Sequence, residues 1–471
     1  MSRLEISPEQ FRAVAGRIAA LAEQYLGELD SLPSFPAGIS GSVVEQAFSQ
    51  ALPQEGLGAA AVEELADVLR YSRPPSPRFF GYVAGSGEPV AAAADLLASV
   101  LNQNVTAWRS APAAVAIERT VVRWLAEAVG CPGFSGSLCA GGSSANLMGL
   151  AMAREKCLAA NDRGAQPGVV YASTEAHMSI GKAVALLGLG RQNLRLIPVD
   201  AEFRLRPDEL QSAIERDRAS EKKLVAVVAS AGTVNTGAID PLPEIAALAR
   251  RHGLWLHVDG AYGALAALAQ PGKFAGLNLA DSISLDPHKW LYQPIDCGCL
   301  LFRDAAEARA AFAHSGDYAR ALSQDPREGF AFFEESLELS RRFRALKLWL
   351  SLRYHGLNAF REAIGRDLEH AQLLAGLIGR HPDLQLLAPA PLSAVCFRSL
   401  GAKGAGQTEL NRLNAAILRR LIERGKVYLS NATLRGCFSL RACFVNHRTR
   451  RQDVEAIVEE VLIVATELAR K

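Results

Sequence analysis

Residues 281–302 read DSISLDPHKWLYQPIDCGCLLF. The apolar runs SISLD and GCLLF are typical of buried β-strands, and His288 and Lys289 stand where the first run ends. A lysine at the rim of a buried sheet is poorly solvated, which favours the neutral amine, and a neutral amine is a nucleophile. The stretch therefore predicts a strand that brings a reactive lysine to the edge of a sheet.

The surrounding chain, from about residue 86 to 340, alternates short apolar runs with helical stretches. The other predicted strands are residues 168–174, 194–199, 224–232 and 254–261, and the predicted helices include residues 143–160 and 241–253. Near-continuous apolar strands separated by helices indicate a mostly parallel sheet that is covered on both faces. Ligands bind such sheets at the carboxyl ends of the strands, so we expect a site there.

The two ends of the chain differ from this pattern. Residues 1–85 contain one amphipathic helix, started by Ser7 and Gln10, and Pro/Gly-rich connectors. We expect them to pack on another body, for which a partner subunit is the natural candidate. Residues 341–471 begin with a helix that Gly356 would cap, and they predict a smaller α+β domain. Its other elements are predicted strands at 393–399, 426–430 and 437–445 and a helix at 451–469.

The composition excludes several classes of function. The chain has 471 residues with 51 Lys and Arg against 49 Asp and Glu, so its net charge of +2 provides no general attraction to nucleic acid or to an anionic membrane. The eight cysteines form no C-x-x-C pair and no Cys/His cluster, which predicts buried thiols in a reducing compartment and no metal site. Without a signal segment or an apolar run of roughly 18 residues, we expect a cytoplasmic protein.

Five residues near the expected strand ends carry useful chemistry. Gly142 and Ser143, in AGGSSANLMG, begin a helix whose free N–H groups would suit a phosphate. Asp259 ends the strand LWLHVDGA, where a carboxylate needs a cation or strong donors. His177 and Thr233 each follow another strand. Taken alone, each residue has an ordinary alternative as a helix cap, a turn residue or a structural histidine.

Together these residues match the needs of pyridoxal 5′-phosphate. This cofactor requires a phosphate cradle, an acid that keeps its ring nitrogen protonated, a flat group against the ring and a lysine for the Schiff base. Asp259 and Lys289 are 30 residues apart, which allows one helix-and-strand excursion between neighbouring strand ends.

The sequence resembles the group II pyridoxal-phosphate decarboxylases, which include the aromatic-L-amino-acid, histidine, glutamate and diaminobutyrate decarboxylases. PRFFGYV, APAAVAIERTVVRWLAEAVGCP, GGSSANLMGLAMARE, HVDGAYG, DPHKW and RRFRALKLWL occur in family order. The resemblance implies the α/β fold of fold-type I, with a mostly parallel seven-stranded sheet in a large domain (86–340). It also implies an N-terminal helical extension (1–85) on the partner subunit, a small C-terminal α+β domain (341–471) and a homodimer with sites at the interface.

The resemblance also implies a role for each matching residue. Lys289 would form the Schiff base, and His288 would contact the phosphate. Asp259 would pair with the pyridine nitrogen. His177 would stack on one ring face, and Ala261 would lie under the other.

Further roles follow from the same resemblance. Gly142 and Ser143 would hold the phosphate, and Thr233 would lie close to the ring. Ser340 would approach the phosphate bound to the partner subunit. Arg441 resembles the arginine that holds the substrate α-carboxylate in glutamate-type members, and its alternative is a buried arginine in a salt bridge.

Residues 314–335, approximately, resemble the mobile catalytic loop of the family. Tyr318 falls where decarboxylases carry a tyrosine that protonates the α-carbon after carbon dioxide leaves, although it could also be an ordinary surface tyrosine. Two positions depart from the family. Asp286 replaces a common Asn, and we expect it to point away from the phosphate or to bond a backbone group. Thr106 is small and polar where aromatic-amino-acid enzymes place a large apolar residue.

The sequence therefore predicts a decarboxylase that releases carbon dioxide and an amine from an L-amino acid, with an aromatic substrate as the best candidate. An acidic or diamino acid remains an alternative substrate. Aldehyde synthesis is disfavoured by Tyr318, because family members that make aldehydes carry phenylalanine there. A catalytically silent cofactor carrier is disfavoured because Lys289, Asp259 and His177 are all present.

Overall fold

A seven-stranded sheet forms the centre of the computed structural model, which describes residues 4–36, 38–314, 325, 327–401 and 404–470. Its strand order is β1-β7-β6-β5-β4-β2-β3. The strands are β1 (Ser135–Cys139), β2 (Val169–Ser173), β3 (Leu194–Ile197), β4 (Leu224–Ser230), β5 (Trp255–Asp259), β6 (Ser282–Leu285) and β7 (Gly298–Phe302). Strands β6, β5, β4, β2 and β3 are parallel, whereas β7 is antiparallel to both of its neighbours. The predicted mostly parallel seven-stranded sheet is confirmed.

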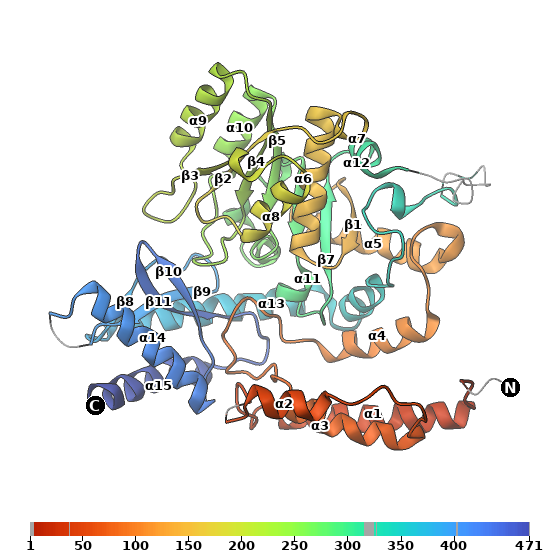
Figure 1. Cartoon of the computed structure of the whole chain (residues 1–471), viewed down its shortest axis with the longest axis vertical. Helices are drawn as coiled ribbons and strands as arrows, with labels where there is room; N and C mark the ends of the chain where they lie inside the picture. The colour runs from red at the N-terminus through yellow and green to blue at the C-terminus, as the bar shows by residue number, and fades with distance from the viewer. Residues whose placement is uncertain (1–3, 37, 315–324, 326, 402–403, 471) are drawn as a thin grey trace.

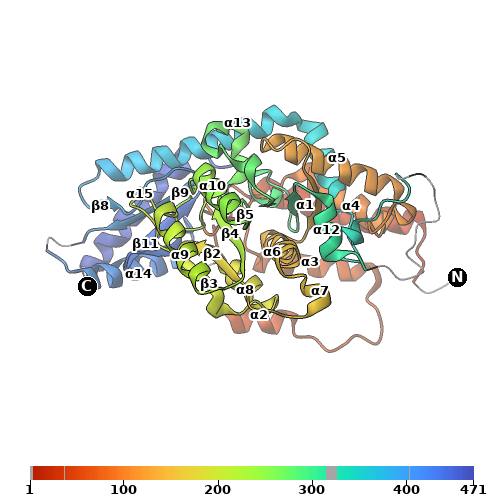
Figure 2. The ribbon, with the colours of Figure 1, turned by 90° about the horizontal axis from the view of Figure 1, so that it is seen from above.

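Helices cover both faces of this sheet (Figure 2). Side chains alternate along β4, so that Ala226 and Val228 join one apolar cluster while Val227 and Ala229 join another. The helices that contribute to the first cluster are α6 (Gly142–Leu158), α8 (Met178–Leu186) and α12 (Ala305–Phe312). Helices α5 (Pro112–Ala128), α9 (Pro207–Ala219) and α10 (Leu242–His252) are among those that contribute to the second. Short helices α7 (Ala160–Arg163) and α11 (Pro287–Trp290) follow α6 and β6.

The C-terminal part contains a second, antiparallel sheet of order β10-β11-β9-β8. Its elements are β8 (Leu384–Leu386), β9 (Ala394–Ser399), α14 (Gln407–Arg424), β10 (Ser430–Leu434), β11 (Cys437–Cys443) and α15 (Arg451–Ala469). The predicted strand at 426–430 is wrong, because the strand begins only at Ser430. Tyr428 instead forms an isolated bridge with Phe79, which draws this segment toward the N-terminal part of the chain.

A long helix, α13 (Ala345–Arg380), joins the two sheets and packs along α4 (Pro89–Leu101). Gly356 has φ +75° and interrupts it, as expected for a glycine that closes a helix. A second helical stretch follows at once, which the sequence analysis did not predict.

The N-terminal helices lie apart from the central sheet, below α4 and α13 in the view of Figure 1. They are α1 (Pro8–Glu28), α2 (Gly41–Phe48) and α3 (Leu65–Tyr71). The predicted start of α1 is confirmed, because Ser7 and Gln10 form a reciprocal capping box. Helix α1 buries none of its residues, and Phe11 and Ile18 are 44% and 45% exposed. None of the helices in the described ranges combines the length and the apolar character needed to cross a membrane.

The start of β7 leaves no room for a side chain. A Cβ added to Gly298 would lie 2.4 Å from the Cα of Gly141, a backbone atom just before α6. We predict that Gly298→Ala lowers the free energy of unfolding by about 1–3 kcal/mol, because the backbone must move. Gly365→Ala is the control, since no atom lies within 4 Å of its added Cβ inside α13. It should stabilise by about 0.5–1 kcal/mol. Urea unfolding of both variants measures these changes, and equal stability of the two would contradict the packing argument.

Candidate active site

The carboxyl ends of β4, β5 and β6 and the N-terminus of α6 surround a cavity of about 650 Å³. The predicted site residues that line it are Gly142, Ser143, His177, Asp259, Ala261, His288, Lys289 and Arg441. These residues are separated by up to about 300 positions in the chain. The fold therefore brings most of the predicted constellation to one place.

Asp259 is buried at the end of β5 and receives hydrogen bonds from three elements. Its Oδ1 accepts from the backbone N–H of Ala261 at 3.2 Å and from the Ser284 hydroxyl at 3.0 Å. Its Oδ2 accepts from Asn146 Nδ2 of α6 at 3.0 Å. Three converging donors provide the surroundings that a buried, ionised carboxylate requires.

Asn146 also connects Asp259 to a buried histidine. Its Oδ1 lies 2.9 Å from Nε2 of His257, whose Nδ1 lies 2.8 Å from the Ser282 hydroxyl. Burial lowers the pKa of His257 to about 4, so its ring is neutral near pH 7. The neutral ring donates from Nε2 to Asn146, which leaves the Asn146 amide to donate to Asp259.

His177 lies at the start of α8, with its Nδ1 2.8 Å from the Ser179 hydroxyl. The N–H of Ser179 also donates to this Nδ1, at 3.3 Å, so the ring proton belongs on Nε2. Burial lowers the pKa of His177, which favours a neutral ring. Asn146 donates to the Ser179 hydroxyl at 3.0 Å and so links this histidine to the Asp259 network.

Lys289 lies on α11 directly after β6, and its amine faces a carboxylate. The Nζ atom is 2.9 Å from Oδ2 of Asp286. The same oxygen is 3.5 Å from Nε2 of His288, whose Nδ1 donates to the carbonyl of Cys297 at 2.7 Å. The expectation that Asp286 points away or bonds a backbone group is wrong. The turn from β6 into α11 directs this side chain into the cavity, beside Lys289.

Helix α6 provides the expected cradle for an anion. It begins at Gly142, and no described side chain caps it. A Cβ on Gly142 would lie 2.6 Å from that of Ala261, so glycine is needed for the helix start to approach the end of β5. The free N–H groups of this first turn face the cavity together with Ser143 and Ser144.

Two predicted residues have side chains engaged in other bonds. Arg441 donates from Nε to the carbonyl of Asn235 at 3.0 Å and from Nη1 to that of Tyr82 at 2.8 Å, and it also bonds the carbonyl of Val234. Its partners are backbone carbonyls and not the acidic side chain of the alternative reading, and its contact with a substrate carboxylate stays a prediction. Thr233 is buried and bonds the Thr236 hydroxyl at 3.0 Å, while its neighbours Gly232 and Val234 line the cavity.

Two further predicted residues, Ser340 and Thr106, do not line this cavity. Ser340 borders a separate hollow of about 410 Å³ together with Arg341. Thr106 lies close to it, since the N–H of Val105 donates to the carbonyl of Arg341 at 2.9 Å. Their predicted contacts with the cofactor and the substrate stay predictions. Tyr318 lies outside the described residues, and its role stays a prediction.

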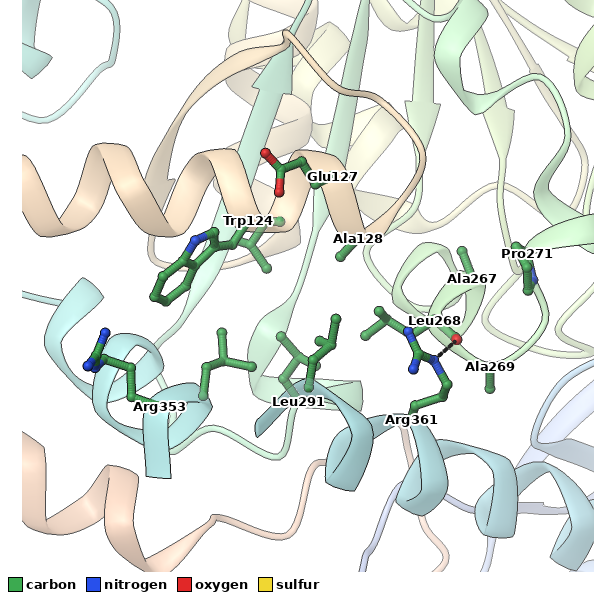
Figure 3. Close-up of a pocket in the computed structure, with 13 residues that line it drawn as sticks. Trp124, Glu127, Ala128, Ala267, Leu268, Ala269, Pro271, Leu291, Arg353 and Arg361 are labelled. Atoms are coloured by element: carbon green, nitrogen blue, oxygen red, sulfur yellow. Dashed lines mark hydrogen bonds between the residues drawn. The ribbon is translucent and has the colours of Figure 1, made fainter. Parts of the chain in front are cut away.

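A larger cavity, of about 750 Å³, lies between α5, α13 and the short 3₁₀ helix η4 (Ala264–Leu268). Figure 3 shows Trp124 and Glu127 on one side and Arg353 and Arg361 on the other. Arg361 is held by a 3.0 Å hydrogen bond to the carbonyl of Leu268. The described residues that line this cavity include no lysine, histidine or aspartate. The smaller cavity is therefore the candidate active site.

Sequence reasoning missed the residues that hold the site in place. Asn146, Ser179, Ser284 and His257 all lie in or beside motifs that were recognised, but none was predicted to act. Asn146 comes four positions after Gly142, one helical turn into α6. This spacing places Asn146 on the same face of the helix as Gly142, and it was the signal in the sequence that could have identified Asn146 as a site residue.

We predict that buried histidines make this protein less stable in acid. Burial lowers the pKa of both His257 and His447 to about 4, below the ordinary value of 6.5. The unfolded chain therefore binds more protons than the folded chain between pH 6.5 and pH 4, and stability falls as the pH falls through this window. His447 lies between Ser86, Glu88 and Arg448 and accounts for up to about 3 kcal/mol of the loss.

His447→Gln tests this contribution. Urea unfolding of wild type and variant at pH 7 and pH 5 should show a smaller loss of stability in the variant. Parallel losses in the two proteins would show that His447 has no part in it.

Comparison with known proteins agrees with this site. Residues 47–400 match the model of the pyridoxal-dependent decarboxylase conserved domain. An aromatic-L-amino-acid decarboxylase of Bacillus atrophaeus is 33% identical over 475 aligned residues, covering 99% of this chain and 98% of the relative. A phenylacetaldehyde synthase of Petunia hybrida is 29% identical, over 93% of this chain and 90% of the relative.

A solved structure is also similar over its whole length. The crystal structure of Oryza sativa TDC with PLP and tryptamine superimposes with a TM-score of 0.93 at 26% identity, covering 100% of both chains. The matched domain spans the cavity from the cradle of α6 to Lys289. This chain therefore belongs to the family of pyridoxal-dependent decarboxylases.

Proposed function

We propose that this protein removes carbon dioxide from an aromatic L-amino acid and releases the corresponding amine. The observation that carries the proposal is the convergence of Lys289, Asp259 and His177 on one cavity. The family uses pyridoxal 5′-phosphate, and the donor set fits this cofactor. An uncapped helix start faces one part of the cavity, and a buried carboxylate and a lysine amine face others.

Each residue has a distinct task in this proposal. When bound, pyridoxal 5′-phosphate supplies an electron sink that stabilises the charge left on the α-carbon. Lys289 Nζ is the amine that would hold the cofactor through its aldehyde carbon. Asp259 would keep a proton on the ring nitrogen, supported by its three donors. His177, neutral and fixed by Ser179, would present a flat face to the ring.

The walls of the cavity support an aromatic substrate. Apolar side chains of Tyr82, Val83, Met178 and Ile295 line it. Tyr82 belongs to an aromatic group in which Phe79 stacks on Tyr428 with ring centroids 4.6 Å apart. An acidic substrate would need a cation for its side chain, but most N–H groups of Arg441 donate to backbone carbonyls. The relatives named for aromatic amino acids point the same way.

We predict that wild type releases carbon dioxide from tryptophan, tyrosine or phenylalanine faster than from glutamate or 2,4-diaminobutyrate. Lys289→Ala should abolish turnover and the visible absorbance of the bound cofactor while the protein stays folded, because the role of the lysine is chemical. Lys182→Ala is the control, since this lysine is exposed on the neighbouring helix α8.

Products are measured as amine, aldehyde and carbon dioxide in aerated buffer. Aldehyde as the main product would replace the proposal by aldehyde synthesis, the activity named for the Petunia relative. Release from glutamate alone would contradict the aromatic assignment.

We also propose that a second copy of the chain covers α4 and α1 and that sites lie at the interface. Helix α4 exposes a row of large apolar side chains: Leu96 54%, Leu97 52%, Val100 57% and Leu101 45%. Together with the exposed apolar residues of α1, these side chains form a group and not single scattered residues. An exposed apolar group of this kind supports self-association. Ser340 would then approach the partner's cavity. The free state of all eight cysteines supports a cytoplasmic location.

The dimer is tested with a charge in the middle of this surface. Val100→Glu should give a monomer in size-exclusion chromatography with light scattering, because a carboxylate cannot be buried there without a partner. Leu196→Glu is a matched control, since Val100 and Leu196 are both 57% exposed and Leu196 lies on the edge strand β3. Monomeric wild type, or an intact Val100→Glu dimer, would contradict the proposed interface.

A further inference from the structure

Asp286 is an acidic residue in the middle of the candidate active site that no step of the proposed reaction uses. Its side chain is only 4% exposed, and its Oδ2 is 2.9 Å from Nζ of Lys289. Its Oδ1 is buried and accepts no hydrogen bond from any described residue. A buried carboxylate oxygen without a donor is costly, so its position needs an explanation.

The carboxylate lies where the phosphate of the cofactor is expected. A Cβ built on Gly142, the first residue of α6, would be 3.1 Å from Oδ2, and one on Gly141 would be 3.8 Å from Oδ1. Asp286 therefore faces the uncapped N-terminus of α6, the region of the cavity best suited to an anion. One fixed negative charge already stands beside this cradle.

Asp286 has one ion-pair partner among the described lysines and arginines. Lys289 is the ion-pair partner, and the titratable groups that act on Asp286 or lie near it are His288, His177, Cys139 and Cys297. Burial lowers the pKa of both histidines, raises the pKa of Cys139 to about 12 and raises the pKa of Cys297, so all four favour their neutral forms. Among the described residues, Lys289 is therefore the permanently charged side chain that forms an ion pair with Asp286.

We propose that Asp286 is an internal counter-ion of Lys289 that opposes the phosphate of the cofactor and so sets how tightly this protein holds pyridoxal 5′-phosphate. Two negative groups a few ångströms apart repel each other strongly when buried. A Lys289 Nζ that is bonded to the cofactor would also have fewer N–H groups to donate to Asp286. The ion pair thus stabilises the cofactor-free protein. The inference rests on the assignment of this cavity to the cofactor.

Asn in place of Asp286 keeps the shape and removes the charge. Its amide could also donate to a phosphate, and Lys289 would be left as an unopposed cation. All three changes favour the phosphate, so the sign of the effect does not depend on which of them dominates. A ligand without a phosphate gains none of these interactions.

The experiment is a titration of full-length protein, freed of cofactor, with pyridoxine 5′-phosphate and with pyridoxine. Neither compound has an aldehyde, so neither can bond to Lys289, and calorimetry measures binding alone. The phosphate preference is the ratio of the two dissociation constants, pyridoxine over pyridoxine 5′-phosphate. In Asp286→Asn this ratio should rise about tenfold or more. Asp383→Asn is the control, because it removes a carboxylate whose side chain is 67% exposed and distant from the cavity.

Asp286→Ala provides a second uncharged variant should the Asn variant fold poorly, as judged by circular dichroism. Its ratio should rise too, because the charge is again absent. An unchanged ratio in both variants overturns the inference and leaves the cofactor assignment intact. A lower ratio also overturns it, since Asp286 would then carry a proton and donate to the phosphate. If folded wild type and variants bind neither compound, the cavity does not hold the cofactor, and the proposed function fails together with the inference.

Discussion

The burial of a carboxylate at the end of the central strand is the constraint on which the site depends. Asp259 cannot be ionised there without donors, and each donor comes from a different element: α6, β6 and the turn after β5. The parallel register that sets Asp259 opposite Ser284 is therefore part of the chemistry, not only of the fold. The same network fixes the start of α6, and with it the cradle for the phosphate.

Glycine makes this convergence possible. The α6 start touches Ala261 on one side and the start of β7 on the other, and Gly142 and Gly298 have no side chain to hold them apart. Because β7 runs antiparallel to β1 and β6, its first residue lies at the same edge of the sheet as the ends of the parallel strands. Close backbone packing thus places the cradle within reach of Asp259 and Lys289.

The sequence predicted the parallel core because its strands are continuous apolar runs that end in polar residues. Strand β1 escaped prediction because SGSLC carries no β-branched residue and resembles a loop. The strand at 426–430 was placed too early because Tyr428 is apolar enough for a strand but packs against Phe79 instead. Such contacts join residues about 350 positions apart, and no local pattern contains them.

At the candidate site, too, the sequence predicted which residues meet but not how every side chain is directed. Residue types and their order were enough to predict that Lys289, Asp259 and His177 lie at one cavity, because strand ends converge in this fold. They were not enough to predict the direction of the Asp286 side chain, because this direction depends on the turn between β6 and α11. Ser340 marks another boundary, since it borders a separate hollow and not the cavity that Lys289 lines. The apolar wall around Tyr82 and Val83 is the part of the substrate pocket that this chain builds.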